Sequence, residues 1–318
     1  MKKSLLALAV LGAFAGAASA QSSVTLYGKV DLGVGKATGS ADKQVRDGAG
    51  SRVGIKGVED LGGGMKALFG FEHRFNPDTG KDATNDSSNG SAPGNASNVF
   101  WNGYSTVGLG GAFGTVNLGR QYTSSFSLVQ NAFDPFGGDT VAGLRDSSLR
   151  IAPARMRIAN SIRYDGTFGG VKIAADIAER TTGTDRPYTL AAQYAAGPVL
   201  AAISYENPEG GSDKLLNAGV AYTFGPAKLA LAGSTGKNAA NASVKGYLIG
   251  ATVNVGPAGR VLVGYAQNKV GSADADKKAS VGYRHDLSKR TFLYTDFTRV
   301  NKLATEKTGY DFGVQHNF

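Results

Sequence analysis

The chain has 318 residues, a formal net charge of +9 and a mean hydropathy of −0.16, and it contains 46 glycines, 13 tyrosines and 15 phenylalanines but no cysteine. The lack of cysteine excludes disulfides, thiolate metal sites and thiol catalysis. Abundant glycine and aromatic residues beside only nine prolines favour short strands and tight turns over helices, so we expect an all-β fold.

The first 20 residues have the order of features typical of a secretory signal peptide. Lys2 and Lys3 precede a mostly small and apolar run at 4–18, and Ala18-Ser19-Ala20 has the small-x-small form of a cleavage site. We expect cleavage after Ala20, which leaves 318 − 20 = 298 residues (21–318) with a formal charge of 32 − 25 = +7. An uncleaved anchor is the alternative, but the run is short for a spanning helix.

No later apolar run approaches the roughly 20 residues that a spanning helix needs. For an exported chain, two classes remain: a soluble secreted protein, and a β-barrel whose alternating hydrophobicity leaves the average low. Nucleic acid is not an expected partner. The positive charge alone does not distinguish a lumen that attracts anions from an outer surface that meets lipopolysaccharide phosphates.

Apolar and polar residues alternate with a period of two along several segments. In 24–34, Val24, Leu26 and Val30 share one face, while Tyr27 and Lys29 lie on the other. The pattern recurs at 171–178, 188–194, 199–205 and 218–224. One face suits lipid and the other suits water, although a soluble sandwich shows the same period.

The connections between these segments alternate in length. Short ones occur at 59–63, 110–112, 166–170, 225–226, 256–259 and 286–289, and longer polar ones at 37–49, 76–97, 123–155, 207–213, 237–243, 270–276 and 301–307. Short periplasmic turns that alternate with longer outer loops are typical of a transmembrane barrel. Counting the hairpins between these connections gives about sixteen strands. We therefore predict an antiparallel transmembrane β-barrel with an aqueous lumen as the single domain 21–318.

The last segment, 309–318, also alternates, with Tyr310, Phe312, Val314, His316 and Phe318 on one face. A membrane barrel leaves no free edge, so we expect this strand to pair with the first one.

Five segments taken together resemble the Gram-negative general porins, most closely the beta-proteobacterial type of Bordetella, Burkholderia and Comamonas. They are 24–28 (VTLYG), 51–60 (SRVGIKGVED), 113–121 (FGTVNLGRQ), 136–139 (FGGD) and the terminal Phe318. The resemblance covers essentially all of 21–318. It implies a homotrimer of sixteen-stranded barrels in the outer membrane, in contact with lipid and lipopolysaccharide, inserted by the barrel-assembly machinery with Phe318 as the C-terminal residue.

The resemblance also implies a constriction made by the third outer loop, about 123–155, folded into the barrel. Basic wall residues face acidic loop residues there. The motifs carry over Lys29, Arg52 and Arg120 as wall positions, and Arg157 and Arg163 are further candidates from the next strand.

Strand parity agrees with most of these assignments. Lys29 and Arg52 alternate with apolar neighbours, and Arg157 and Arg163 alternate with Ile158 and Ile162. Unbroken alternation places Arg120 on the lipid side with Leu118, so a bulge, or a strand end at Gly119, has to be assumed.

The loop departs from the Pro-Glu-Phe-Gly-Gly-Asp run of cation-selective relatives. Here it reads Asp134-Pro135-Phe136-Gly137-Gly138-Asp139, so the glutamate is replaced by proline, and Asn131 stands at a position that is acidic in some relatives. Arg145, Arg150 and Arg155 lie in or beside the loop. We predict a channel that passes ions and small hydrophilic solutes by passive diffusion with a preference for anions, with Asp134 and Asp139 as the acidic counterweight. The plainer alternative is that such arginines are solvated or bind lipopolysaccharide and that such acids cap turns.

Other functions remain open. A channel specific for phosphate or organic acids is the nearest alternative, and an adhesin or receptor barrel is more remote. An enzyme is not expected, because His73, His285 and His316 lie near no recognisable serine motif, and neither a cofactor nor a metal is expected. Asp78, Asp82 and Asp86 lack the calcium-loop spacing, and the resemblance instead implies that loop 76–97 contacts a neighbouring subunit.

Overall fold

The structure is a computed structural model that describes residues 22–83, 99–180, 185–208, 211–273 and 275–318. The expected signal peptide at 1–20 lies outside the described residues, as does much of loop 76–97. Within the described part, no helix is long and apolar enough to cross a membrane.

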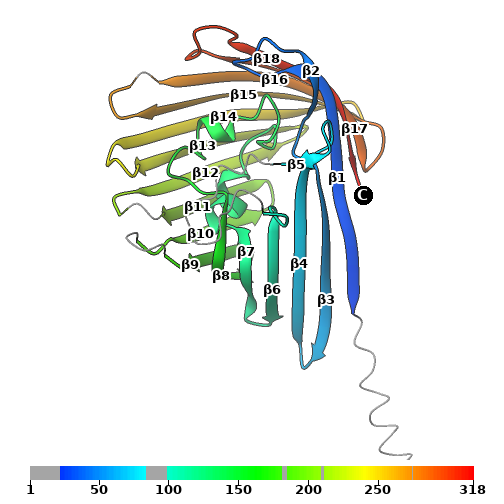
Figure 1. The fold of residues 1–318 in the computed structure, drawn as a ribbon, viewed down its shortest axis with the longest axis vertical. Coiled ribbons are helices and arrows are strands. Elements are labelled where there is room, and N and C mark those ends of the chain that lie inside the picture. Colours follow the sequence, from blue (N-terminus) through cyan, green and yellow to red (C-terminus); the bar gives the residue numbers. More distant parts are fainter. Residues whose placement is uncertain (1–21, 84–98, 181–184, 209–210, 274) are drawn as a thin grey trace, which may run out of the picture.

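Sixteen antiparallel strands form a closed barrel (Figure 1). The prediction of about sixteen strands is therefore confirmed. Two further short strands, β2 (Gln44–Asp47) and β5 (Lys81–Asp82), lie in the first two loops. The barrel strands are β1 (Ser23–Lys36), β3 (Arg52–Gly62), β4 (Met65–Asn76), β6 (Tyr104–Gly111), β7 (Gly114–Tyr122), β8 (Arg157–Phe168), β9 (Val171–Ala178), β10 (Tyr188–Ala196), β11 (Val199–Asn207), β12 (Lys214–Phe224), β13 (Ala227–Lys237), β14 (Ser243–Val255), β15 (Gly259–Val270), β16 (Asp276–Asp286), β17 (Thr291–Val300) and β18 (Thr308–Asn317).

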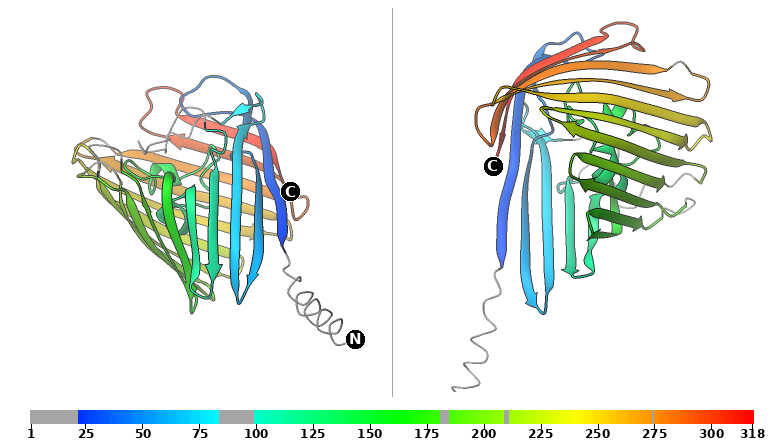
Figure 2. Two further views of the ribbon diagram at one scale, coloured as in Figure 1. Left: turned by 60° about the horizontal axis from the view of Figure 1, so that its bottom comes forward. Right: turned by 180° about the vertical axis from the view of Figure 1, so that it is seen from behind.

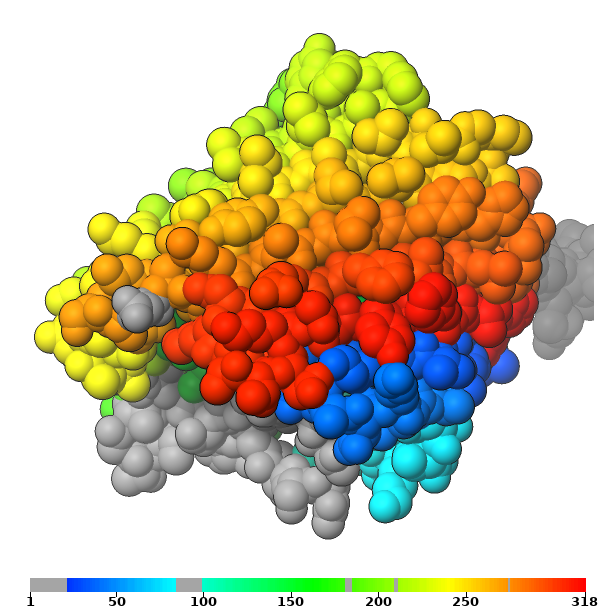
Figure 3. Space-filling model, turned by 90° about the horizontal axis from the view of Figure 1, so that it is seen from above, coloured from blue at the N-terminus to red at the C-terminus, as the bar shows by residue number. Residues whose placement is uncertain are grey.

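The barrel closes through β1, which pairs with β3 along its first half and with β18 along its second half. Figure 3 shows the last strands in red lying against the first residues in blue. The backbone N–H of Phe318 donates to the Gly28 carbonyl oxygen, and the Gly28 N–H donates to Phe318 in return, both at 3.0 Å. The predicted pairing of the last strand with the first is thus confirmed, and among the described barrel strands no edge is left unpaired.

The connections are short at one end of the barrel and mostly longer at the other (Figure 2). The short turns include every short connection expected from the sequence. The turn at Gly197-Pro198, between β10 and β11, and the loop between β9 and β10 were not expected. The turn was missed because Ala195 and Ala196, directly before it, put alanine on both faces and blur the alternation. By the usual rule for such barrels, the turn end is periplasmic and the loop end faces outward.

Side chains alternate between the lumen and the outer surface as predicted. On β13 and β14 the outward Leu231 and Ile249 are 55% and 54% exposed, whereas the inward Ala232 and Leu248 are 4% and 0% exposed. Outward aromatic pairs lie near both ends of the strands, for example Tyr188 with Tyr205 and Tyr222 with Phe224. This exposed apolar belt with aromatic borders is the surface that a bilayer covers.

Residues 123–156, between β7 and β8, fold into the barrel, which confirms the expected inward loop. They contain the short helices η1 (Phe126–Gln130) and η2 (Arg145–Ser147). The loop buries Val129, Phe133, Phe136, Leu144 and Leu149 against the inner wall, where most contacting side chains are small: Ala191, Ala202, Ala221, Ala230, Ala232, Leu248, Leu262 and Ala266. Each large apolar side chain that leaves water here stabilises the loop by about 1.5 to 3 kcal/mol.

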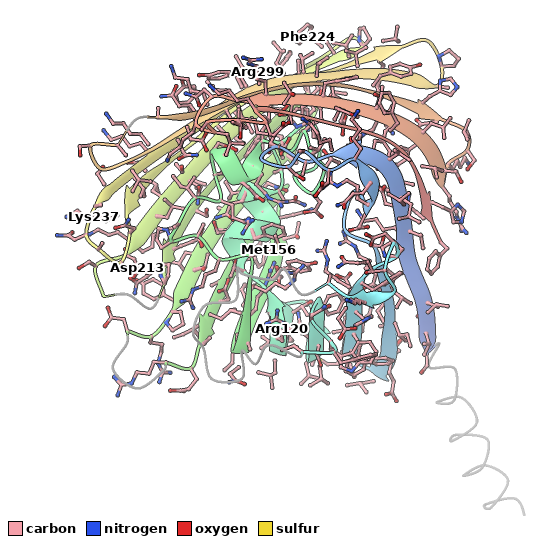
Figure 4. The ribbon with its side chains drawn as sticks, turned by 45° about the horizontal axis from the view of Figure 1, so that its top comes forward. Arg120, Met156, Asp213, Phe224, Lys237 and Arg299 are labelled. Carbon is pink, nitrogen blue, oxygen red and sulfur yellow. The ribbon has the colours of Figure 1, made fainter. Side chains whose placement is uncertain are left out.

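A bulge between β7 and β8 resolves the parity conflict at Arg120. The strand register shifts between Gly119 and Gln121, with Gly119 at φ +122° and Asn160, on β8, at φ +52°. Arg120 (labelled in Figure 4) is only 8% exposed and does not lie with Leu118 on the lipid side. Of the two options that the sequence left open, the bulge is the one found.

We predict that Gly119→Ala destabilises the barrel by about 2 kcal/mol or more, because alanine rarely adopts this φ and its Cβ would overlap the Ser105 carbonyl oxygen. Thermal unfolding of the folded protein in detergent measures the effect. Gly233→Ala is the matched control, since that strand glycine has an ordinary φ and its nearest neighbour, the Gly246 oxygen, lies 3.3 Å away. Equal melting of the two variants would show that the bulge needs no glycine.

Candidate functional site

Three basic side chains form a row across neighbouring strands inside the barrel. Lys29 of β1 is the register partner of Arg52 of β3, and Arg52 is the partner of Arg74 of β4. Like charges directly opposite each other on a sheet destabilise it. Such a row persists only where something else offsets the repulsion.

Asp139, in the inward loop, is the acid that meets this row. Its Oδ2 lies 3.2 Å from Arg74 Nη2 and 3.6 Å from Arg52 Nη2, and its Oδ1 lies 3.0 Å from Arg145 Nη2. Burial alone would raise the pKa of Asp139, but the charges of Arg74, Arg145, Lys29 and Arg52 outweigh it and hold the pKa well below its ordinary value. One carboxylate thus serves several cations.

A hollow of about 480 Å³ lies between the inward loop, the β4 wall and the first outer loop. Its lining has six basic residues and four acidic ones, a formal excess of 6 − 4 = +2. The basic residues are Arg46, Arg74, Arg145, Arg150, Arg157 and Lys278, and the acidic ones are Asp47, Asp78, Asp139 and Asp146.

Of the basic residues predicted from the sequence, Lys29 and Arg52 lie in the basic row, and Arg157 lies in the lining of the hollow. Arg157 lines the hollow, packs over the Tyr122 ring with its Cζ 4.5 Å from the ring centroid, and donates to the Tyr122 hydroxyl at 3.0 Å.

Arg120 and Arg163 make structural contacts instead. Arg120 donates from Nε and Nη2 to the Asn102 carbonyl oxygen, at 3.2 and 3.0 Å, and so holds the end of the second loop. Arg163 pairs with Asp165 and donates from Nη1 to Ser127 Oγ at 2.8 Å, which ties the start of the inward loop to the wall. Neither lines the hollow.

Asp134 is in the inward loop but not in the lining of the hollow. Its carboxylate accepts the backbone N–H groups of Phe136, Leu144 and Arg145 at 2.9, 2.6 and 2.8 Å. Burial raises the pKa of Asp134, and these three donors oppose the shift. Asp134 is therefore a turn cap, the alternative already considered for loop acids, and Asp139 alone of the two predicted acids meets the basic row.

Arg74 and Glu72 on β4 were not predicted from the sequence. The signal was present, because Gly70, Glu72 and Arg74 alternate with the outward Phe69, Phe71 and His73. Glu72 is buried and accepts the hydroxyls of Tyr27 and Tyr122 at 3.2 and 3.1 Å. Its position, 3.9 Å from Arg52 Nη1, gives the row a second, weaker counter-charge.

A buried polar network holds the start of the inward loop against β11 and β12. Glu206 accepts from Ser125 Oγ at 2.7 Å, from Asn217 Nδ2 at 3.2 Å and from Gln130 Nε2. Its second oxygen accepts the backbone N–H of Arg155 at 3.2 Å. Because Ser125 and Arg155 stand near the two ends of the loop, one carboxylate fixes both.

The three histidines have local partners. His73 pairs with Asp82 and its Nδ1 contacts the Phe100 carbonyl oxygen, His285 contacts the Tyr283 hydroxyl, and His316 contacts Thr291. Among the residues that the structure describes, no group of three or more His, Asp or Glu side chains is placed to hold a metal ion. Asp86, the third acid of the calcium alternative, lies outside the described residues.

Comparison with known proteins identifies the barrel. Residues 7–305 match the model of the Gram-negative porin family. The chain is 35% identical to outer membrane porin protein 32 of Delftia acidovorans and 28% identical to an outer membrane porin protein of Bordetella pertussis, with full coverage of each chain. Among solved structures it is similar to an anion-selective porin from Comamonas acidovorans, with a TM-score of 0.76, 29% identity and coverage of 94% of this chain and 100% of that one.

The closed barrel of sixteen strands, the loop folded into its lumen and the charged hollow beside that loop agree with this match. The chain belongs to the Gram-negative porin family and is an outer-membrane porin.

Proposed function

We propose that this porin favours anions over cations during passive diffusion of ions and small hydrophilic solutes. The observation that carries the proposal is the row of Lys29, Arg52 and Arg74 facing the inward loop, with Asp139 as its main acidic partner. The similar Comamonas porin is described as anion-selective, which supports the same preference.

Fixed charges act strongly here because the wall and the loop are close together. A cluster with a positive excess raises the local concentration of anions and lowers that of cations. Asp139 reduces this excess without cancelling it. Five cations, Lys29, Arg52, Arg74, Arg145 and Arg150, stand against Asp139, Glu72 and Asp146, a formal sum of 5 − 3 = +2. Partial neutralisation suits a channel, because an anion that binds tightly leaves slowly.

The alternatives predict different behaviour. A channel specific for phosphate or an organic acid shows saturable flux, whereas a general porin shows flux proportional to concentration. A receptor barrel shows no conductance while folded. We infer that the chain is not an enzyme, because the family and the relatives that it matches are porins, which are channels.

We also propose that residues 1–20 are removed as a signal peptide and that the barrel assembles as a homotrimer. An aromatic cluster on the outer wall beside the second loop supports the trimer. The rings of Phe71, His73, Phe100 and Trp101 contact one another, and Phe100 is 59% exposed. The distantly similar OmpT barrel of Vibrio cholerae, 12% identical, is described in a trimer form. A second copy of this chain is the partner that we propose for this cluster.

The first test measures the reversal potential in a planar bilayer under a KCl gradient. We expect a chloride-directed potential, and we expect Arg74→Gln and Arg52→Gln each to reduce the chloride-to-potassium permeability ratio roughly twofold to fivefold, the effect of one close unit charge in water. Arg299→Gln, an exposed outward residue labelled in Figure 4, is the control for net charge and leaves the ratio unchanged. A potassium-directed potential in the wild type contradicts the proposal.

A second prediction concerns Asp139 and pH. The folded-state pKa of Asp139 is depressed, so its ion pairs stabilise the protein fully above the carboxyl pKa of the unfolded chain, about 4, and this contribution is lost as the pH falls through the folded value. Asp139→Asn should therefore lower the thermal midpoint by a constant amount between about pH 8 and about pH 5, with the difference shrinking only in stronger acid.

Asp139→Asn should also raise the anion preference, since it removes the main counter-charge. Asp42→Asn, in an exposed stretch of the first loop, is the control and changes neither quantity. A stability difference that already disappears between about pH 7 and about pH 5 would mean that Asp139 is not held by the arginines.

The trimer is tested with Phe100→Ser. The change should weaken association by removing an exposed ring from the aromatic cluster, and native mass spectrometry of the folded protein counts the subunits. Trp101 is the only tryptophan of the chain, so its fluorescence reports the same event. Phe224→Ser, a 48% exposed residue at the turn end (labelled in Figure 4), is the control. A wild-type monomer, or trimers of equal stability, would contradict the proposed interface.

A further inference from the structure

A second set of basic side chains faces the lumen at the turn end of the barrel. Four of the strands that leave a short turn have a lysine or arginine as their second residue: Lys66 on β4, Lys172 on β9, Lys228 on β13 and Arg260 on β15. Arg284, two residues before the end of β16, is the register partner of Arg260. None of the five lines the hollow at the constriction.

Strand alternation shows that these side chains point inward. Ala174, Ala230 and Leu262 have the same parity as Lys172, Lys228 and Arg260, and they are 4%, 7% and 1% exposed. The last two pack against the inward loop. Lys66 has the parity of the buried Glu72, which faces the lumen.

Arg260 and Arg284 form the most ordered part of this set. Both guanidinium groups lie over the ring of Phe292 on β17, with the Cζ atoms 5.9 and 5.4 Å from the ring centroid. Arg284 Nη2 also donates to the Phe136 carbonyl oxygen of the inward loop at 2.7 Å. Two cations thus lie against one aromatic ring, and one of them also contacts the inward loop.

Few acids oppose this set. At the same level of the described strands, the inward acids are Asp60, the register partner of Lys66, and Asp286, whose Oδ1 lies 2.8 Å from Arg260 Nη2. Asp296 of β17, the register partner of Gly282, lies one inward position further from the turn end and also attracts Arg284. The register partners of Lys172 are Thr167 and Gln193, and those of Lys228 are Thr223 and Thr252. With Asp296 included, the formal sum is 5 − 3 = +2.

We propose that Lys66, Lys172, Lys228, Arg260 and Arg284 form a cationic collar that binds small multivalent anions at the turn-end mouth, with Arg260 and Arg284 as its principal contacts. Anions of the phosphate class fit because their oxygens accept from two guanidinium groups at once. This site is separate from the constriction row, and it makes the channel asymmetric: a multivalent anion that enters from the turn end meets a binding zone before the constriction.

Single-channel recording in KCl with pyrophosphate added to one compartment tests the collar. We expect pyrophosphate to block the chloride current at lower concentration from the turn side than from the loop side. Orientation is read from Ser272→Cys, an added thiol in an exposed outer loop of a chain without cysteine, by its access to a reagent that cannot cross the membrane. Equal block from both sides of the wild type overturns the proposal.

The variant Arg260→Gln with Arg284→Gln should raise the half-blocking concentration on the turn side roughly fivefold or more and leave the loop side unchanged. Because Arg284 contacts the inward loop, Arg260→Gln with Lys228→Gln is a second variant that leaves that contact intact, and it should act in the same direction. Lys289→Gln removes an exposed charge from a turn at the same end and should have no effect.

An equal shift in Lys289→Gln, or no shift in either double variant, would reject the collar. The KCl reversal potential, recorded from the same membranes, separates this result from the proposed anion preference. A chloride-directed potential without sided block rejects the collar alone, whereas a potassium-directed potential rejects the preference at the constriction.

Discussion

The packing of the inward loop against an alanine-lined wall determines where everything else in the lumen lies. Phe133 packs close to Gly219 of β12, and the inner faces of β10 to β13 have room for it because their buried residues in this cluster are alanines. Phe136 lies against Gly282 of β16. The loop therefore occupies that side of the barrel and leaves the wall of β1, β3 and β4 facing open space. That wall carries Lys29, Arg52 and Arg74. The constriction is the result of two surfaces placed opposite each other by apolar packing.

The charged residues of the lumen serve two purposes that the structure separates clearly. Asp134, Glu206, Arg120 and Arg163 accept or donate several short hydrogen bonds to backbone or local side chains, so their charges are used to hold the loops. The row on β1, β3 and β4 is different, because neighbouring cations share one main carboxylate. Such repulsion lowers stability, and water in the lumen, with its high dielectric constant, keeps that cost small.

The sequence predicts the barrel well because its signals are local and repeated. A period of two and short glycine-rich turns do not depend on distant contacts, and the same parity places Lys29 and Arg52 in the lumen. The turn at Gly197-Pro198 was missed where alanines occupy both faces. Arg74 was not predicted, because the aromatic side chains of Phe69, Phe71 and His73 are the stronger pattern in this strand and indicate its outer face. The alternation with these residues nevertheless places Arg74 on the lumen side.

The site was less predictable because it depends on how a loop of 34 residues packs, from 123 to 156. Asp134 and Asp139 flank the same short motif, and nothing in their spacing shows that one caps backbone N–H groups while the other reaches across to Arg74. The position of Arg120 required a bulge whose cause, the left-handed backbone of Gly119, is not distinguishable from the many other glycines of the chain.

The distribution of charge along the lumen bears on how a channel can both select and conduct. A single strong site would retain its ion, whereas several weaker sites in series let one ion displace the next. In this barrel the constriction cations are partly neutralised by Asp139 and Glu72, and Arg260 at the turn end is partly neutralised by Asp286. Arg284 of the turn-end set contacts the carbonyl oxygen of Phe136, and Arg74 of the constriction row contacts Asp139, three residues later. The two sets of cations therefore meet the same short stretch of the inward loop. The inward loop thus separates two cationic zones of moderate strength, an arrangement in which anions are concentrated without being trapped.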